Sequence, residues 1–215
     1  TDDSVYEGNE TAIVAISGVS GGNAVESGNQ SVTLTITEND SAPTVTLATS
    51  SSSVAENAST TVTLTATSSA ASSLDIVVTL GVTGTATEGT DYSSIDESIT
   101  ISAGDTTGTK TFTMTDDSTY EGDETVIVAI SSVSNATENG TQSVTTTISE
   151  NESSPTVQIS SSASSVYDNG MSLTITATSS QVADEAITVV IGTSGTSTEG
   201  TDYATVSNIT IAAGS

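Results

Sequence analysis

The sequence contains no cysteine, no histidine and no tryptophan, and Lys110 is its only basic residue. Without cysteine there are no disulfides and no thiolate nucleophile, and without histidine a His-based catalytic triad is impossible. The same two absences remove the soft ligands of zinc and copper sites. One lysine offers no basic surface to phosphates or anionic lipids, so we expect neither nucleic-acid binding nor docking on a membrane.

Aromatic residues are also scarce, at 3% of the chain. Paired carboxylates can cut glycosides, but a sugar site needs aromatic platforms, which this chain nearly lacks. No Gly-rich phosphate loop or dinucleotide fingerprint occurs. No run approaches the ~18 consecutive apolar residues of a membrane span, so direct membrane insertion is not expected. The sequence therefore predicts a protein that is not an enzyme.

Acidic and small residues dominate what is present. The net charge is −26, and Ser, Thr, Val and Ala are abundant. Such a composition raises the possibility of disorder. However, 33% of the residues are apolar and alternate regularly with Thr, which is a strand pattern. We expect a folded β protein whose charge keeps it soluble but loosens it by self-repulsion.

A repeat of about 112 residues runs through the chain. PTVTL at 43–47 returns as PTVQI at 155–159, and TEGTDY at 87–92 returns at 198–203. Differences in length between the copies fall in expected loops, where insertions cost little.

This period predicts three pieces: the C-terminal part of one domain at 1–41, a complete domain at 42–153, and the N-terminal part of the next at 154–215. Pro43 and Pro155 stand just before the first strand of a repeat, where a missing N–H costs nothing. Because no signal peptide is visible and Thr1 is not a natural start, we expect a window of a longer array.

The complete domain shows seven strand patterns bounded by Gly, Ser, Asn and Asp. They are 44–49, which is followed by a short piece at 53–55, and then 61–67, 74–80, 98–101, 109–115, 124–131 and 142–148. Val62, Leu64 and Ala66 form the expected inward set of one strand, and Phe112 and Met114 that of another. The strand ETVIVAIS is apolar at every central position, which predicts cover on both faces. The fold class is all-β: tandem seven-stranded, immunoglobulin-like β-sandwiches.

Carboxylates crowd into short loops. TDDSTYEGDE at 115–124 carries five of them, and the related TDDSVYEGNE opens the chain at 1–10. Such groups raise one another's pKa values, so a fold keeps them solvated or places them around a cation. An all-oxygen, acidic site suits a hard cation, with calcium first. The plainer alternative is a solvated turn, since Asp, Asn and Gly are ordinary turn residues.

Several carboxylates of the complete domain lie at strand ends that could meet at one pole of the sandwich. They are Glu56, Asp91, Asp116, Asp117, Glu121, Glu124, Glu150 and Glu152. That number would be enough for more than one calcium ion, at about 6–8 oxygens each. Gly89 and Gly122 would allow the tight turns around the ions, while Tyr92, Tyr120 and Tyr203 are expected to pack at the sandwich end.

Four motifs of the complete domain resemble the Calx-beta domain, which occurs in sodium–calcium exchangers and in long bacterial surface adhesins. They are SVAEN, GTATEGTDY, TMTDDSTYEGDETVIVAIS and TTTISENE. The resemblance implies a seven-stranded sandwich that binds calcium at one tip, with the eight carboxylates above as ligands. By the same motifs, the flanking pieces offer Asp2, Asp3, Glu7, Glu10, Glu38, Asp40, Asp168 and Asp202. The sequence departs from the family where the final acidic run is Glu-Asn-Glu and where Asp168 replaces a Glu.

The sequence favours a calcium-binding structural repeat of a long extracellular surface protein or filament. Calcium at the domain tips would stiffen a rod used for adhesion or matrix building. The expected partners are neighbouring copies of the same repeat, tandem or joined in a polymer by strand exchange, and an unknown surface or matrix target. One alternative is a calcium-sensing regulatory module attached to a membrane protein, and another is an adhesin module that binds sugar or protein directly.

Overall fold

The computed structural model describes residues 3–215, and these fold almost entirely as β-structure. The described part has fifteen strands, one short 3-10 turn at Glu56–Ala58 (η1) and no α-helix. Thr and β-branched residues fill the strands, and both favour extended backbone over helix. No helix in the described range is long and apolar enough to cross a membrane.

The chain divides into two compact units. The first comprises residues 1–52, 61–113 and 125–146, and the second comprises residues 53–60, 114–124 and 147–215. The first unit holds most of the sandwich of residues 44–149, and the second holds the acidic loop 114–124, residues 150–152 and the C-terminal strands.

The first sheet has four strands in the order β10-β3-β5-β8. Their bounds are Thr44–Thr49 (β3), Thr61–Ser68 (β5), Thr107–Thr113 (β8) and Thr137–Glu138 (β10). β3 pairs antiparallel with β5, and β5 pairs antiparallel with β8 with Val62 opposite Phe112. β10 adds to β3 in parallel. β8 is therefore an edge strand of this sheet.

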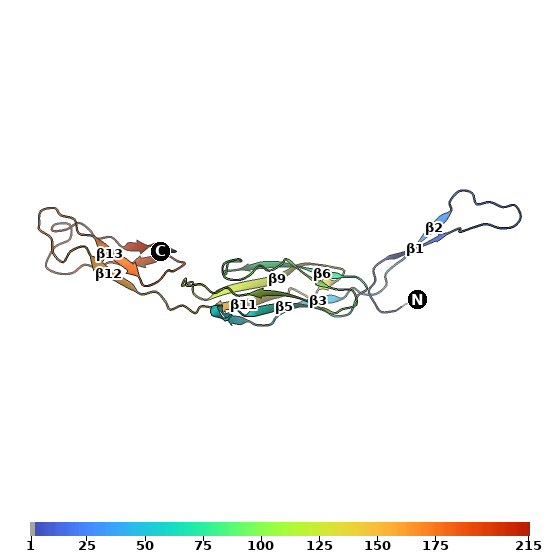
Figure 1. The fold of residues 1–215 in the computed structure, drawn as a ribbon, viewed down its shortest axis with the longest axis horizontal. Helices are drawn as coiled ribbons and strands as arrows, with labels where there is room; N and C mark the ends of the chain where they lie inside the picture. Colours follow the sequence, from blue (N-terminus) through green and yellow to red (C-terminus); the bar gives the residue numbers. More distant parts are fainter. Residues whose placement is uncertain (1–2) are drawn as a thin grey trace. The chain divides into compact units, whose positions relative to one another are not determined.

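The second sheet has five strands in the order β4-β11-β9-β6-β7. Their bounds are Ser53–Ala55 (β4), Ile76–Gly84 (β6), Ser98–Ile101 (β7), Glu124–Ser134 (β9) and Ser143–Ser149 (β11). β6 pairs antiparallel with both β7 and β9, while β4 joins the end of β11 in parallel. The two sheets form the layers of a β-sandwich, which confirms the predicted fold class for this domain (Figure 1).

The core lies between the sheets and is made of alternate strand positions. Its largest fully buried side chains in the sandwich are Val45, Val62, Leu64, Ile76, Val78, Ile99, Ile101, Phe112, Val126 and Val128. The predicted inward residues of β5, and Phe112 and Met114, are all buried. Tyr92 packs its ring edge-on against Phe112 at 5.8 Å and 70°, so the expectation that it closes the sandwich is confirmed.

A glycine lets the two edge strands β7 and β8 approach each other. A Cβ built on Gly108 of β8 would lie 2.5 Å from the backbone oxygen of Thr100 in β7. No real side chain tolerates that distance, so the sheets can close at this side only because Gly108 has none.

β8, expected at 109–115, runs from Thr107 to Thr113, and three further details differ from the sequence prediction. β6 begins at Ile76 and not at residue 74, because the N–H of Leu74 turns back to donate to the Ser72 hydroxyl at 3.1 Å. The two-residue β10 was not predicted. The expectation that β9 is covered on both faces is wrong: Val126, Val128 and Ile130 are buried, but Ile127 and Ala129 of the opposite face are only half-buried.

The flanking pieces form isolated strand pairs with registers like those of the complete domain. β12 (Val157–Ser161) pairs with β13 (Ile175–Ser179), with Val157 opposite Ser179 as Val45 is opposite Ser68. The remaining pairs are β1 (Glu10–Ala15) with β2 (Ser31–Ile36), and β14 (Ile187–Val189) with β15 (Ile209–Ile211).

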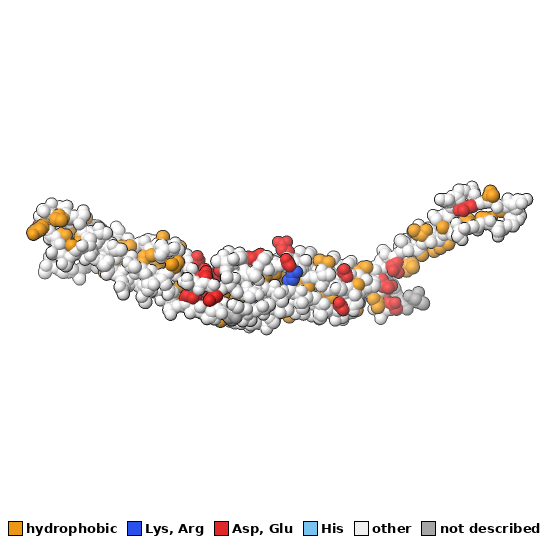
Figure 2. All heavy atoms as spheres, in the orientation of Figure 1, with side chains coloured by type: hydrophobic (Ala, Val, Ile, Leu, Met, Phe, Trp, Pro, Cys, Tyr) orange, Lys and Arg blue, Asp and Glu red, His pale blue; other side chains and the backbone are white. Residues whose placement is uncertain are grey.

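Apolar residues of the hairpin β1–β2 are exposed, with Ile13 at 69% and Val32 at 62%, and they appear as orange side chains in Figure 2. The division into domains at 41/42 and 153/154 stays a prediction.

Candidate metal centre

Glu150 joins the acidic loop 114–124 to the end of β11. Its Oε2 accepts hydrogen bonds from the backbone N–H groups of Glu121 at 2.6 Å and Gly122 at 2.7 Å. Its Oε1 accepts two more from Asn151 and Glu152, both at 2.9 Å. Burial acts to raise the pKa of Glu150, but these hydrogen bonds to the charged form prevail and lower it to about 2. Glu150 is therefore an ionised anchor for the loop.

Glu56 follows β4 and begins the 3-10 turn η1. Only 4% of its surface is exposed. Burial, and then the charges of Glu150 and Glu152, raise the pKa of Glu56 to about 7. The fold thus holds a carboxyl group close to other carboxylates in a place where it resists ionisation unless a positive charge arrives.

Glu152 completes this group with an unsatisfied atom. Its Oε2 is buried and has no hydrogen-bond donor among the described residues. The pKa of Glu152 is raised, first by its side-chain interaction with Glu150 and then by burial and nearby charge. A hydrogen bond between two carboxyls requires a proton on one of them, so when both are ionised Oε2 has no donor among the described residues.

These side chains form two groups that share Glu56. One oxygen atom from each of Glu56, Glu150 and Glu152 lies within 4.8 Å of the others, and the same holds for Glu56, Asp117 and Glu121. No lysine or arginine other than Lys110 exists in the chain to compensate them. Figure 2 shows the same imbalance over one face, with many red side chains and little blue.

Three carboxylates of the loop, Asp116, Asp117 and Asp123, also accept hydrogen bonds that hold the loop in shape. Oδ1 of Asp117 accepts the N–H of Thr119 at 2.6 Å, and Oδ1 of Asp116 accepts the Asn151 side-chain amide at 3.3 Å. Glu124 is half-buried at the first position of β9. Asp123, which sequence reasoning did not include among the ligands, accepts the N–H of Glu150 at 3.0 Å. The only sequence feature that could have pointed to Asp123 is its position within the acidic stretch 115–124.

Gly122 has a φ of +80°, and a Cβ on it would meet nothing within 4 Å. This left-handed conformation turns the N–H groups of residues 121 and 122 toward the Glu150 carboxylate, as the predicted tight turn requires.

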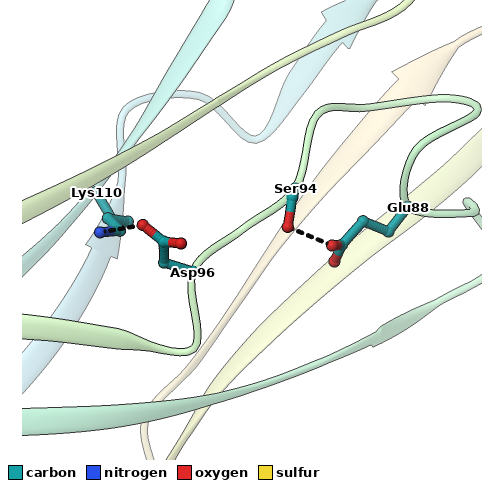
Figure 3. A network of polar contacts seen from close by, with 4 residues as sticks. All are labelled: Glu88, Ser94, Asp96 and Lys110. Carbon is teal, nitrogen blue, oxygen red and sulfur yellow. Dashed lines mark hydrogen bonds and ion pairs between the residues drawn. The ribbon is translucent and has the colours of Figure 1, made fainter.

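Asp91 lies in the other compact unit, in the loop between β6 and β7. It is 5% exposed, and its Oδ2 accepts the N–H of Thr87 at 2.6 Å. The Ser94 hydroxyl donates to the Glu88 carboxylate across the same loop (Figure 3). The only ion pair of the described residues, between Lys110 and Asp96, is nearby and at the surface (Figure 3).

Asp202 occupies the equivalent position in the C-terminal piece. Its carboxylate accepts the N–H of Thr198 at 2.7 Å, as that of Asp91 accepts the N–H of Thr87.

The N-terminal piece repeats the Glu150 arrangement. Oε2 of Glu38 accepts the N–H groups of Glu7 at 2.5 Å and Gly8 at 2.6 Å, and Asn9 accepts the N–H of Glu38. Backbone hydrogen bonds, that of Asp40 first, lower the pKa of Glu38. The charges of Glu10 and Asp3 raise the pKa of Glu7.

A hollow of ≈ 60 Å³ is lined by five predicted ligands of this piece: Asp3, Glu7, Glu10, Glu38 and Asp40. Among the described residues, no three of these carboxylates have oxygens within 4.8 Å of one another. Asp2 lies outside the described residues. Asp168 and Asp202 are exposed and belong to no such group in the described chain.

The comparison with protein families agrees with this geometry. The model of the Calx-beta domain matches residues 38–153. The chain belongs to the Calx-beta family. Calx-beta domains are calcium-binding β-sandwich modules of structural or regulatory type, and they are not catalytic. No curated protein matches the sequence.

The donor set of this Calx-beta domain fits a hard divalent cation. Glu56, Glu152, Asp117 and Glu121 offer oxygen ligands only, and the buried Oε2 of Glu152 lacks any other partner within the described residues. Calcium accepts carboxylates in flexible geometry, whereas magnesium demands near-octahedral coordination and keeps its waters. A bound calcium ion would supply the positive charge that these side chains lack and would hold the loop 114–124 against η1 and residues 150–152.

Proposed function

We propose that this chain is a calcium-binding structural repeat of a long extracellular surface protein or filament. In this proposal, calcium at the domain tips stiffens a rod that serves adhesion or matrix building. The observation that carries it is the group of Glu56, Glu150 and Glu152, whose oxygens converge within 4.8 Å with one of them buried and unpaired in the described structure.

Each side chain of the group has a separate role. Glu150 positions the loop, because its two oxygens already accept four backbone N–H groups. Glu56 and Glu152 are the main calcium ligands, since their raised pKa values mark groups that gain most from a cation. Asp117 and Glu121 add ligands from the loop that precedes β9.

A rod is supported by the repeat and by the charge. Similar acidic loops recur at residues 1–10 and 115–124, each followed by a strand pair and a short Pro-containing segment. A chain of net charge −26 repels itself, and cations at each tip would reduce that repulsion. An extracellular place fits this proposal because calcium sites of millimolar to submillimolar affinity are common in extracellular modules. The partners would be neighbouring copies of the repeat and a surface or matrix target.

The proposal is tested by thermal unfolding of the full chain in calcium, in magnesium and in chelator. A ligand that binds only the native state must raise stability, by about 2.7 kcal/mol when its concentration is 100-fold above Kd. We expect calcium to raise the Tm by on the order of 5–10 °C in a chain of this size. Magnesium is expected to raise it less.

Two matched variants locate the effect. Glu152→Gln keeps the shape of the side chain but removes a ligand charge, so calcium should raise its Tm much less than that of the wild type. Glu97→Gln makes the same change at an exposed position and should respond to calcium as the wild type does. Equal unfolding in calcium and in chelator would refute calcium binding by this group of carboxylates.

A further inference from the structure

The backbone of Tyr120 contacts the segment that follows β13. The Tyr120 N–H donates to the carbonyl of Val182 at 3.0 Å, and the Tyr120 carbonyl accepts the N–H of Asp184 at 3.1 Å. The two hydrogen bonds form an isolated parallel β-bridge between Tyr120 and Ala183. The acidic loop of the complete domain is thus paired to residues of the next repeat, within one compact unit.

The same bridge occurs at the start of the chain, within the other compact unit. Tyr6 forms a parallel bridge with Ser72, and its carbonyl accepts the N–H of Ser73 at 3.1 Å and the Ser72 hydroxyl at 2.9 Å. Tyr6 and Tyr120 occupy the same place in their TDDS-x-YEG motifs. Because the same bridge occurs at two places in the chain, we infer that it belongs to the repeat and is not an accident of one junction.

The receiving segment is prepared for this contact by its own domain. The carbonyl of Ser72 accepts the N–H of Gly104, and the carbonyl of Ala183 accepts the N–H of Gly214, both at 2.8 Å. Ser72 and Ala183 are both buried. Each receiving residue is therefore held from one side by the Ala-Gly turn of its own repeat and from the other by the tyrosine of the preceding one.

We propose that the Tyr-Glu-Gly turn is the docking element by which each repeat holds the next, and that residues 72–74 and 182–184 are its receptors. The residues directly after Tyr120 are Glu121 and Gly122, whose N–H groups donate to Glu150. One short loop thus contacts the carboxylate group on one side and the next repeat on the other. Resting on the proposed function, a calcium ion that fixes this loop also fixes the orientation of the following repeat.

The two junctions differ in strength. Ser72 adds a hydroxyl hydrogen bond to the Tyr6 carbonyl that Ala183 cannot provide. A Cβ on Gly8 would lie 3.3 Å from the side chain of Leu74, whereas nothing lies within 4 Å of one on Gly122. The first junction is therefore the more tightly packed.

The test measures the distribution of distances across the second junction by pulsed electron paramagnetic resonance. The chain has no cysteine, so spin labels can be placed on cysteines introduced at two exposed strand positions, Thr100 and Thr176. Asp184→Pro removes the N–H that donates to Tyr120. Asp184→Ala removes the same side chain but keeps the N–H. We expect a narrow distribution in calcium for the wild type and for Asp184→Ala, and loss of the narrow distribution for Asp184→Pro.

An Asp184→Pro distribution as narrow as that of Asp184→Ala would overturn the docking role. Because proline can disturb folding, a second pair of variants avoids it. Ala183→Ser should narrow the distance distribution across the second junction, measured with the labels at Thr100 and Thr176. Ser72→Ala should broaden the distribution across the first junction, measured with labels at Thr33 and Thr100. If neither Ala183→Ser nor Ser72→Ala changed the width of its distance distribution, the proposal would also be contradicted.

Calcium titration of the same variants separates this inference from the proposed function. Asp184 is not among the proposed ligands, so Asp184→Pro should bind calcium as the wild type does. Bridges that persist in a chain insensitive to calcium would refute the proposed function but keep the docking role. Calcium binding together with a distance distribution that none of these substitutions changes would refute the docking role and keep the proposed function.

Discussion

At the scale of single residues, Glu56 and Glu150 show how surroundings separate two identical side chains. Glu150 accepts hydrogen bonds from four backbone N–H groups, and its pKa falls to about 2. Glu56 is buried beside the charges of Glu150 and Glu152, and its pKa rises to about 7. Glu150 is therefore ionised at all physiological pH values, whereas Glu56 changes its charge near neutrality.

Glu56→Gln should make the calcium-free protein less sensitive to pH. A raised pKa in the folded state stabilises the fold below the unfolded value of 4.5, and this contribution is lost as pH rises through about 7. Glutamine does not titrate, so the variant does not lose this stabilisation as the pH rises. Its Tm in calcium-free buffer should therefore equal or fall below that of the wild type at pH 4.5 and exceed it at pH 8.

The Glu97→Gln variant, at an exposed glutamate, is the control for the general effect of removing one negative charge. A constant difference in Tm between Glu56→Gln and the wild type from pH 4.5 to 8 would contradict the assignment of Glu56 as the titrating group. Added calcium should replace the proton on Glu56, so calcium binding by the wild type should release protons and strengthen with pH.

Sequence reasoning reached the members of the carboxylate group but not their separate roles. Glu56, Asp117, Glu121, Glu150 and Glu152 stand at strand ends, and strand order alone brings such ends together. Which glutamate is an anchor depends on backbone N–H groups aimed by a turn, which has no signature beyond a glycine. The burial of Oε2 of Glu152 likewise depends on packing that no sequence pattern records.

At the scale of elements, the edge strands β7 and β8 depend on Gly108. Replacing it with alanine would place a Cβ at 2.5 Å from the Thr100 carbonyl oxygen and at 2.8 Å from the Ile99 side chain. Overpacking of this kind costs about 1–3 kcal/mol, and a backbone oxygen yields less easily than a side chain. We expect Gly108→Ala to lower the free energy of unfolding by about 3 kcal/mol in denaturant titrations.

Gly81→Ala is the matched control, because a Cβ on Gly81 of β6 meets nothing within 4 Å. It should change the stability little or raise it slightly, since alanine loses less backbone freedom on folding than glycine. If both variants unfolded alike, the approach of β7 to β8 would not depend on the missing side chain.

Most strands could be predicted because alternation of Val, Ile and Leu with Thr has the period of the pleat. β10 could not, since two residues carry no period. The beginning of β6 was misplaced because LDIVVTL continues the apolar run through Leu74, and only the Ser72 hydroxyl diverts the chain there. β9 resembled a strand covered on both faces, yet Ile127 and Ala129 remain partly exposed.

At the scale of the whole molecule, the net charge of −26 opposes folding. Salt shortens the screening length from about 10 Å at 0.1 M to about 3 Å at 1 M. In calcium-free buffer, raising NaCl over this range should therefore raise the Tm. The rise should be smaller in saturating calcium, because bound ions already compensate the densest group. A Tm that falls with NaCl, or rises equally with and without calcium, would contradict this account of the charge.

The single lysine limits where trypsin-like proteases can cut the chain. An enzyme that cuts only after lysine or arginine has a single target bond here, between Lys110 and Thr111. That bond lies inside β8, where Leu64 pairs with Lys110 and Thr63 with Thr111. An intact sandwich keeps such a strand out of reach of a protease cleft, so trypsin-like digestion can begin only where β8 has detached. In a setting rich in trypsin-like enzymes, the durability of this chain would therefore depend on how rarely one edge strand opens.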